Sequence, residues 1–263
     1  MYGENLYYCT LSKDFKAYIY DMNEVDVTLL CGSRPELLNQ TLDTFSEKVF
    51  PNFSIGNVYV NIDLHGGGTS EQKKCSTVVK KIFPDAQINL TAKPNFTKAV
   101  CYLWRKPQSR YFLHLEDDWI ALSPIFQKNI DILLIKKVKQ VQIVKPRIEQ
   151  SLLGRKRWRP QSISPIYLPN FKKPSFATSP SFIESDFANK IALRIDKNLN
   201  PEKQMFNGMN PELENFLQQY ISTALVKWWQ PPKIKDIGRD WLVENGLENT
   251  IINGKHGYKK ISS

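Results

Sequence analysis

The chain has 263 residues, of which 41% are hydrophobic and 12% aromatic, and its formal net charge is +10. This composition excludes a disordered chain and is typical of a globular protein with a substantial core. The charge favours anionic partners without choosing among them. No apolar run reaches membrane-spanning length, and the four cysteines lack paired spacing. We therefore expect neither a zinc site nor a disulfide framework, and a reducing, cytoplasmic location.

The first predicted strand and helix follow a short extension. Residues 1–23 are rich in tyrosine and precede the main domain, which we place at residues 24–263. Val25–Cys31 is a β-rich run that ends at a glycine, which predicts a strand. Ser33 can cap a helix directly after it, with Glu36 reaching back to complete a capping box. The pattern predicts a strand, a tight turn and a helix.

A second unit of the same kind follows. Residues 58–63 read as a strand, and a loop with three consecutive glycines separates it from a polar helix over residues 70–83. Asp63 stands at the end of that strand. The glycines would allow a ligand to approach the backbone, but a flexible turn is the simpler interpretation. A short strand at 88–90 and a helix at 96–104 come next.

Three consecutive carboxylates end the most apolar strand of the sequence. Tyr111–Leu115 reads as a buried strand, and Glu116, Asp117 and Asp118 follow it directly. Adjacent carboxylates repel one another unless a cation or bound hydroxyl groups lie between them. Oxygen ligands of this type suit magnesium or manganese, which commonly complete their shell with substrate phosphates. A solvated acidic loop is the alternative, and the position at a strand end weighs against it.

The pattern changes after the next helix and strand. The sequence predicts a helix at residues 123–135 and a strand at residues 138–144. Strands and helices therefore alternate through the first 145 residues, which predicts a three-layer α/β sheet. The basic cluster at 136–139 is typical of an ordinary soluble surface. Residues 146–180 contain many prolines and basic side chains, and loops of this length are usually functional or mobile. The basic stretch at 155–159 is a candidate lid.

The second half offers two acidic residues at a helix start. Residues 181–183 look like a return to the core, followed by a helix over about 184–191. Asn210 and the proline after it open another helix, with Glu212 and Glu214 in its first turn. The helix dipole alone explains acidic residues there.

Two segments resemble the glycosyltransferases of the GT-A fold, close in style to family 2. Val27–Leu38 is similar to that family's first strand and helix, and Leu115–Asp118 is similar to its acidic metal motif. The resemblance implies a GT-A type three-layer α/β/α sandwich with a Rossmann-like, mostly parallel central sheet. It also implies a nucleotide-sugar-binding half at 24–145, and an acceptor-binding half with a C-terminal tail at 146–263.

The resemblance implies a role for each matching residue. Asp118 would bind Mn²⁺ or Mg²⁺ between the donor phosphates, with His256 completing the metal shell. Glu212 would be the catalytic base that deprotonates the acceptor, with Glu214 as the second choice. Lys259 is one further cation near the leaving diphosphate. The donor-binding residues would be Cys31, Ser33, Arg34, Asp63, Glu116, Asp117, Arg239 and Lys255.

The expected function is therefore a metal-dependent hexosyl- or pentosyltransferase. It would move a sugar from a nucleotide diphosphate sugar, with UDP as the first choice, to a hydroxyl of a glycan or another acceptor. Inversion with a glutamate base is expected, and retention remains open if no base is present. Nucleic acid is not an expected partner, whereas peripheral membrane contact through the basic loops is compatible with the charge. The alternatives are a nucleotidyltransferase of related fold and a non-catalytic basic module that binds nucleic acid or acidic glycan.

Overall fold

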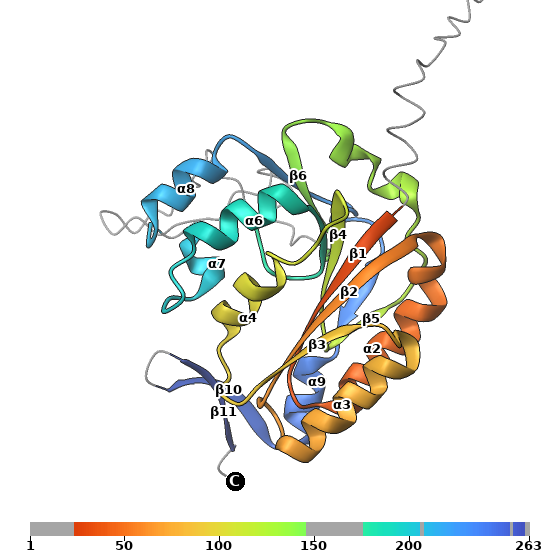
Figure 1. The fold of residues 1–263 in the computed structure, drawn as a ribbon, viewed down its shortest axis with the longest axis vertical. Helices are drawn as coiled ribbons and strands as arrows, with labels where there is room; N and C mark the ends of the chain where they lie inside the picture. The colour runs from red at the N-terminus through yellow and green to blue at the C-terminus, as the bar shows by residue number, and fades with distance from the viewer. Residues whose placement is uncertain (1–23, 146–175, 206–207, 253–254, 261–263) are drawn as a thin grey trace, which may run out of the picture.

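The computed structural model describes residues 24–145, 176–205, 208–252 and 255–260, and from residue 249 onward it describes the backbone alone. A central sheet is covered by helices (Figure 1). The elements in chain order are β1 (Glu24–Cys31), α2 (Pro35–Lys48), η1 (Phe50–Asn52), β2 (Ser54–Asp63), α3 (Thr69–Ile82), β3 (Gln87–Thr91), α4 (Phe96–Leu103), β4 (Tyr111–Glu116), β5 (Trp119–Ala121), η2 (Gln127–Asn129), η3 (Asp131–Leu134), β6 (Val138–Gln142), β7 (Ser181–Glu184), α6 (Ser185–Arg194), α7 (Pro201–Gln204), α8 (Pro211–Leu217), β8 (Ile221–Ala224), β9 (Ile234–Asp236), α9 (Gly238–Glu244), β10 (Leu247–Ile252) and β11 (Lys255–Lys260).

The main sheet has seven strands in the order β3-β2-β1-β4-β7-β6-β8. The strand β7 runs antiparallel to both of its neighbours, and the other pairs in this sheet are parallel. Two small antiparallel ladders, β5-β9 and β10-β11, lie outside it. The predicted α/β class with a Rossmann-like, mostly parallel sheet is confirmed.

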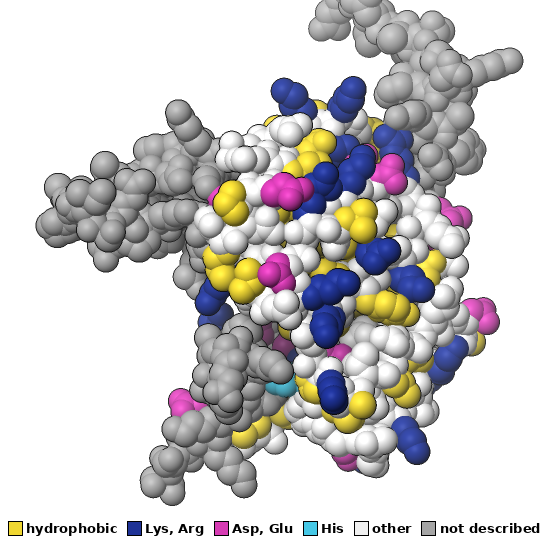
Figure 2. Space-filling view, turned by 60° about the vertical axis from the view of Figure 1, so that its left-hand side comes forward, with side chains coloured by type: hydrophobic (Ala, Val, Ile, Leu, Met, Phe, Trp, Pro, Cys, Tyr) yellow, Lys and Arg dark blue, Asp and Glu magenta, His cyan; other side chains and the backbone are white. Residues whose placement is uncertain are grey.

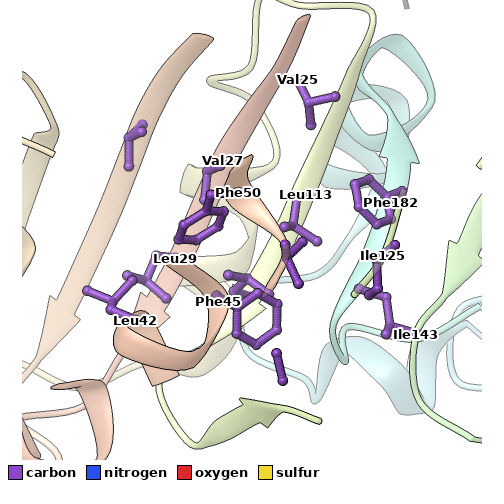
Figure 3. Packing of buried hydrophobic residues seen from close by; sticks show 14 of the residues in the cluster. Val25, Val27, Leu29, Leu42, Phe45, Phe50, Leu113, Ile125, Ile143 and Phe182 are labelled. Atoms are coloured by element: carbon purple, nitrogen blue, oxygen red, sulfur yellow. The ribbon is translucent and has the colours of Figure 1, made fainter. Parts of the chain in front are cut away.

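Helices cover both faces of this sheet. On one face Leu42 and Phe45 of α2 pack against the side chains of Val27, Leu29 and Leu113, which are all buried (Figure 3). On the other face α4, α6 and α8 pack against sheet residues of the opposite orientation. Each of the long buried strands β1, β2 and β4 therefore contributes apolar side chains to two separate clusters, one on each face of the sheet.

Two local predictions were wrong. The helix expected at 123–135 is instead a pair of 3₁₀ turns, η2 and η3. The capping box at Ser33 is absent because its hydroxyl donates to the carbonyl oxygen of Asp63 over 2.8 Å. Helix α2 begins at Pro35 with Arg34 as its N-cap and no side-chain cap. In both places a tertiary contact replaced the local preference.

Several elements had no prediction, among them β5, α7 and every element from β8 onward. The extension at 1–23 and the candidate lid at 155–159 lie outside the described residues. Within the described residues, no helix combines the length and the apolar character that a membrane crossing requires. On the face in Figure 2, Lys and Arg side chains are spread widely rather than gathered in one groove.

Candidate active site

The order of the strands reverses between β1 and β4. From β1 the sheet continues to β2 and β3 on one side, whereas β4 lies on the other. In open α/β sheets, ligands bind in the crevice at the carboxyl ends of the strands where such a reversal occurs. The turn after β1 carries Ser33 and Arg34, and Glu116, Asp117 and Asp118 lie at the end of β4. The structure thus brings the two predicted segments to one edge, which we call the acidic edge.

Arg34 links two carboxylates of the acidic edge. Its Nε and Nη2 donate to both carboxylate oxygens of Asp117, and Nη2 also donates to Oδ2 of Asp118 over 3.1 Å. The guanidinium carbon lies 5.6 Å from the ring centroid of Trp241 in α9. Because Arg34 is buried, this planar fork holds both carboxylates in a fixed orientation. Its contribution is therefore to organise the acidic edge.

Asp117 ties β4 to the neighbouring elements. Its side chain is 2% exposed, and Oδ2 accepts a hydrogen bond from the backbone N–H of Gly32 over 2.9 Å. Its own N–H donates to the carbonyl oxygen of Leu30, and its carbonyl oxygen accepts from the hydroxyl of Thr41. With these contacts Asp117 fixes the turn after β1 and the start of α2 relative to β4.

The turn after β1 and the glycine-rich loop after β2 touch through their backbones. The N–H of Ser33 donates to the carbonyl oxygen of His65 over 2.7 Å. A Cβ atom on Gly32 would lie within 3.0 Å of that oxygen, and one on Gly67 within 3.0 Å of the carbonyl oxygen of Ser33. Gly66 has a φ of +84°, which side chains disfavour. The glycines are therefore required by close packing of two turns.

Asp118 reaches the surface, with 21% of its side chain exposed. The ladder β5-β9 brings a second acidic residue to it, because Trp119 pairs with Asp236. The N–H of Ile237 donates to the carbonyl oxygen of Asp118 over 2.8 Å. A Cβ atom on Gly238 would lie within 3.0 Å of the Asp118 carboxylate. The start of α9 therefore packs directly on this carboxylate.

Negative charge is crowded around Asp118. Burial and the charges of Asp117 and Asp236 together raise the pKa of Asp118 to about 6, against the opposing charge of Arg34. The positive charge of the Arg34 guanidinium thus does not fully offset the effect of burial and of the neighbouring carboxylates on this pKa. A site of this kind favours a bound proton or a cation.

Glu116 lies deeper in the same cluster. Its Oε2 accepts a hydrogen bond from Nε1 of Trp119 over 3.1 Å. Burial raises the pKa of Glu116 well above its usual value, and the charges of Asp118 and Glu202 raise it further. Oε1 of Glu202 in α7 accepts from the N–H and the hydroxyl of Thr178, over 3.3 and 3.1 Å. Glu202 is therefore a held carboxylate whose charge acts on the acidic edge.

The residues predicted for the nucleoside pocket lie at the ends of β1 and β2. Cys31 belongs to the core, and burial raises the pKa of its thiol well above the usual value. Asp63 accepts from the side-chain amide of Asn61 and, over 3.1 Å, from the N–H of Asn95. Ser33 hydrogen bonds the carbonyl of Asp63. The structure places Ser33 and Asp63 together, and Cys31 beneath them.

The two predicted bases lie on α8. The side chain of Glu212 is 80% exposed, and its Oε1 lies 3.6 Å from Nε of Arg194. Glu214 is buried and accepts a hydrogen bond from the N–H of Gly208. Figure 1 shows α8 far from α9, which packs on Asp118. The structure does not bring these two glutamates to the acidic edge.

The predicted C-terminal residues divide into two groups. Arg239 in α9 is 78% exposed, and its Nε lies 3.4 Å from Oδ2 of Asp236. The structure therefore places this cation beside the acidic edge. Lys255, His256 and Lys259 belong to β11, where His256 pairs with Ile251 of β10. Their side chains lie outside the described residues.

The residues present fit a divalent cation that completes its shell with substrate oxygens. In the part of the chain that the structure describes, no three His, Cys, Asp or Glu side chains form a ready metal cage. Asp118 and Asp236 are neighbouring carboxylates whose mutual repulsion a cation would relieve. Magnesium is typically held by one or two carboxylates together with substrate phosphates. The donor set is therefore compatible with such an ion.

Sequence reasoning missed Asp236 and Glu202. The segment Asn200–Glu202 repeats the Asn-Pro-Glu pattern that predicted the start of α8, and Asn200 is in fact the N-cap of α7. That repetition was a usable signal. Asp236 is followed two residues later by Gly238, which suits a close approach, but no periodic pattern identified β9.

No protein-family model and no curated protein matches the chain. Among solved structures, the fold is similar to the mannosyltransferase PcManGT from Pyrobaculum calidifontis, solved in complex with GDP-Man and Mn²⁺, at 12% sequence identity and a TM-score of 0.48. The similarity covers 75% of this chain and 54% of that one, so the chain spans about half the length of that protein. At this level it is a similarity of chain path, and no functional argument rests on it.

Proposed function

We propose that this protein is a glycosyltransferase that uses a nucleotide diphosphate sugar and a divalent cation. The observation that carries the proposal is the position of Asp118, a half-buried carboxylate at the strand reversal with Asp236 beside it. The turn after β1 supports this function over nucleotidyl transfer. It is short and tightly packed, and its cation, Arg34, is engaged with carboxylates rather than turned toward a phosphate.

Asp118 and Asp236 would hold Mn²⁺ or Mg²⁺, and His256 remains a candidate third ligand. When bound, the cation would stabilise the negative charge of the departing diphosphate. Arg239 stands beside these carboxylates and would add positive charge at the same place. Lys255 and Lys259 keep this role as candidates. Arg34 would position the acidic edge, since its guanidinium is already engaged.

The nucleoside would lie over the ends of β1 and β2, where Ser33 and Asp63 meet. Both are buried and held by hydrogen bonds, so they would form the rigid floor of the pocket. Glu116 and Asp117 would shape the pocket for the ribose and the sugar, and Cys31 would support it from below. A uridine nucleotide remains the first choice of donor.

We place Glu202 ahead of Glu212 and Glu214 as the catalytic base. Its negative charge raises the pKa of Glu116, whereas α8 lies apart from the acidic edge. In this reaction the glutamate would take the proton of the acceptor hydroxyl as its oxygen bonds to the anomeric carbon. The bond between that carbon and the diphosphate breaks at the same time, and configuration inverts. A positioned base of this kind contributes about 10²–10⁴-fold to the rate.

A panel of nucleotide sugars with Mn²⁺, scored by released nucleotide, tests the proposal. We expect turnover with a restricted set of donors, and its loss in Asp118→Ala and in chelator. Glu202→Gln should lose about 10²-fold or more in kcat while donor affinity is kept. Glu212→Gln is the matched control and should stay active. Turnover that survives chelation and Asp118→Ala would refute the metal assignment. If Glu212→Gln is inactive and Glu202→Gln is active, the catalytic base is Glu212 and not Glu202.

A further inference from the structure

The segment between β5 and β6 exposes an unusual number of large apolar side chains. Leu122, Phe126, Ile132 and Ile135 are 42%, 44%, 41% and 55% exposed. Over all the residues that the structure describes, ten large hydrophobic side chains are exposed, and these four fall within fourteen consecutive positions. Single exposed hydrophobic residues are ordinary, but a concentration of this kind usually marks an interaction surface.

The local fold explains why these side chains face outward. Ile125, Ile130 and Leu133 of the same segment are buried in the core under α2. Consecutive 3₁₀ turns take the place of the expected helix, so the residues between these three inward anchors cannot also reach the core. The outward set therefore lies on the outer side of the segment. We name Leu122, Phe126, Ile132 and Ile135, together with the lysines described next, the corner patch.

Three exposed lysines belong to the corner patch. They are Lys128, Lys136 and Lys137, and Asp131 is the one acidic residue of the segment. The ammonium nitrogen of Lys128 lies 5.7 Å from the ring centroid of Phe126. The edge strand β8 adds Ile221, which is 46% exposed and donates its N–H to the carbonyl oxygen of Lys137. The patch therefore combines apolar and cationic side chains, with Ile221 beside it.

The corner patch lies at the edge of the sheet opposite the acidic edge. The hydroxyl of Tyr111, the first residue of β4, donates to the carbonyl oxygen of Leu133 over 3.2 Å. Lys48, at the end of α2, donates to the carbonyl oxygen of Ala121 over 3.2 Å. Both contacts are made at the starting ends of the parallel strands, whereas Asp118 follows the carboxyl end of β4. A surface bound at the patch would leave the acidic edge free.

We propose that the corner patch docks on an anionic membrane surface. The four apolar side chains would enter the boundary between headgroups and acyl chains, and the lysines would contact lipid phosphates. Charge disfavours a second copy of the chain as the occupant. Each patch carries three lysines and one aspartate, so two patches facing each other would repel. Nucleic acid would match the lysines but offers nothing to the aliphatic side chains. This inference does not depend on the proposed reaction.

Sedimentation with vesicles tests the proposal. The full chain is mixed with vesicles of phosphatidylcholine alone or of phosphatidylcholine with phosphatidylglycerol. We expect binding to the anionic vesicles. Each lysine near an anionic surface is worth about fivefold in partitioning, so K128E/K136E/K137E should weaken binding by about 100-fold or more. The matched control K73E/K74E/K81E reverses three exposed lysines of α3, a helix without an exposed large apolar side chain, and should weaken binding only a few-fold.

The apolar contribution is tested separately with I132S/I135S, which leaves the charge unchanged. We expect this variant to lose binding at high salt, where screening has removed most of the attraction by lysine. Equal losses in the two lysine variants would refute docking by the patch. Absence of binding to anionic vesicles would also refute it, as would a dimer in light scattering that I132S/I135S dissociates. If the chain binds RNA but not vesicles, and K128E/K136E/K137E loses the RNA binding, the patch is a nucleic-acid site and the membrane proposal is wrong.

Discussion

Replacing Asp118 by Asn should make the protein more stable at neutral pH. The pKa of this carboxyl rises from 3.8 in a free side chain to about 6 in the fold, mainly through burial and the charge of Asp117. A group whose pKa is raised on folding contributes its full stability below the unfolded pKa and loses it as the pH rises through the folded pKa. Each pKa unit corresponds to 1.36 kcal/mol, so ionised Asp118 costs the folded state on the order of 3 kcal/mol above pH 6.

Asn is nearly isosteric with Asp and carries no charge, so Asp118→Asn should remove this cost. We expect the melting temperature at about pH 7.5 to rise by about 6–12 °C in chelator, with little difference at about pH 4. Differential scanning calorimetry across this pH range measures it, with Glu47→Gln as a control at a side chain that is 71% exposed. Addition of Mn²⁺ with a nucleoside diphosphate should stabilise the native chain and not the variant. An Asp118→Asn protein that is less stable than the native chain at neutral pH would refute the reasoning.

Three other predictions concern the surroundings of the acidic edge and the core of the sheet. Arg34→Ala should lower the free energy of unfolding in urea by about 3–5 kcal/mol, because it leaves the buried carboxylate of Asp117 without its cation. Arg34→Lys should cost less stability. It should still reduce kcat/KM, because an ammonium group cannot donate to two carboxylate oxygens in the planar geometry of the guanidinium. Gly67→Ala should destabilise the fold by about 1–3 kcal/mol, because its Cβ would collide with the backbone of the turn after β1. Gly68→Ala is the control and should be nearly neutral, because its Cβ meets only the end of a flexible side chain. Equal effects of the two substitutions on stability would contradict this packing. Burial lowers the pKa of His114 to about 3, so the native chain should lose stability as the pH falls from 6.5 toward 3. The double variant His114→Phe, Thr28→Val removes the imidazole together with its hydrogen-bond partner, and it should lose less stability than the native chain over this pH range. The same loss of stability with acid in both proteins would contradict the role of His114.

The first half of the fold was predictable because its strands and helices are long and regular. The strands ending at Cys31, Asp63 and Glu116 each have one consistently apolar face, and the helices between them keep an apolar stripe. Their order alone predicts that the carboxyl ends meet at one edge. The helix expected at 123–135 failed because its apolar residues divide between the core and the corner patch, and spacing alone does not reveal that division.

The second half of the site depends on contacts that local patterns do not encode. Asp236 reaches Asp118 through a strand of three residues, too short to show any periodicity. Glu202 lies in a single helical turn, α7, whose start resembles that of α8. Sequence reasoning recognised only the start of α8, and it therefore named Glu212 and Glu214. The two starts share the Asn-Pro-Glu pattern, and only the structure shows that the charge of Glu202 acts on Glu116.

The pairing of β5 with β9 also sets the order in which the site can form. Trp119 leaves the ribosome long before Asp236. The strands β3, β2, β1 and β4 can pair with one another before β9 has been made. Until β9 docks, Asp118 lacks both the carboxylate of Asp236 and the start of α9. Contacts so distant in sequence form late because a long loop must close first. A nascent chain would thus hold most of the main sheet while Asp118 still lacks Asp236 and α9, so the acidic edge is completed only after β9 has been made and has paired with β5.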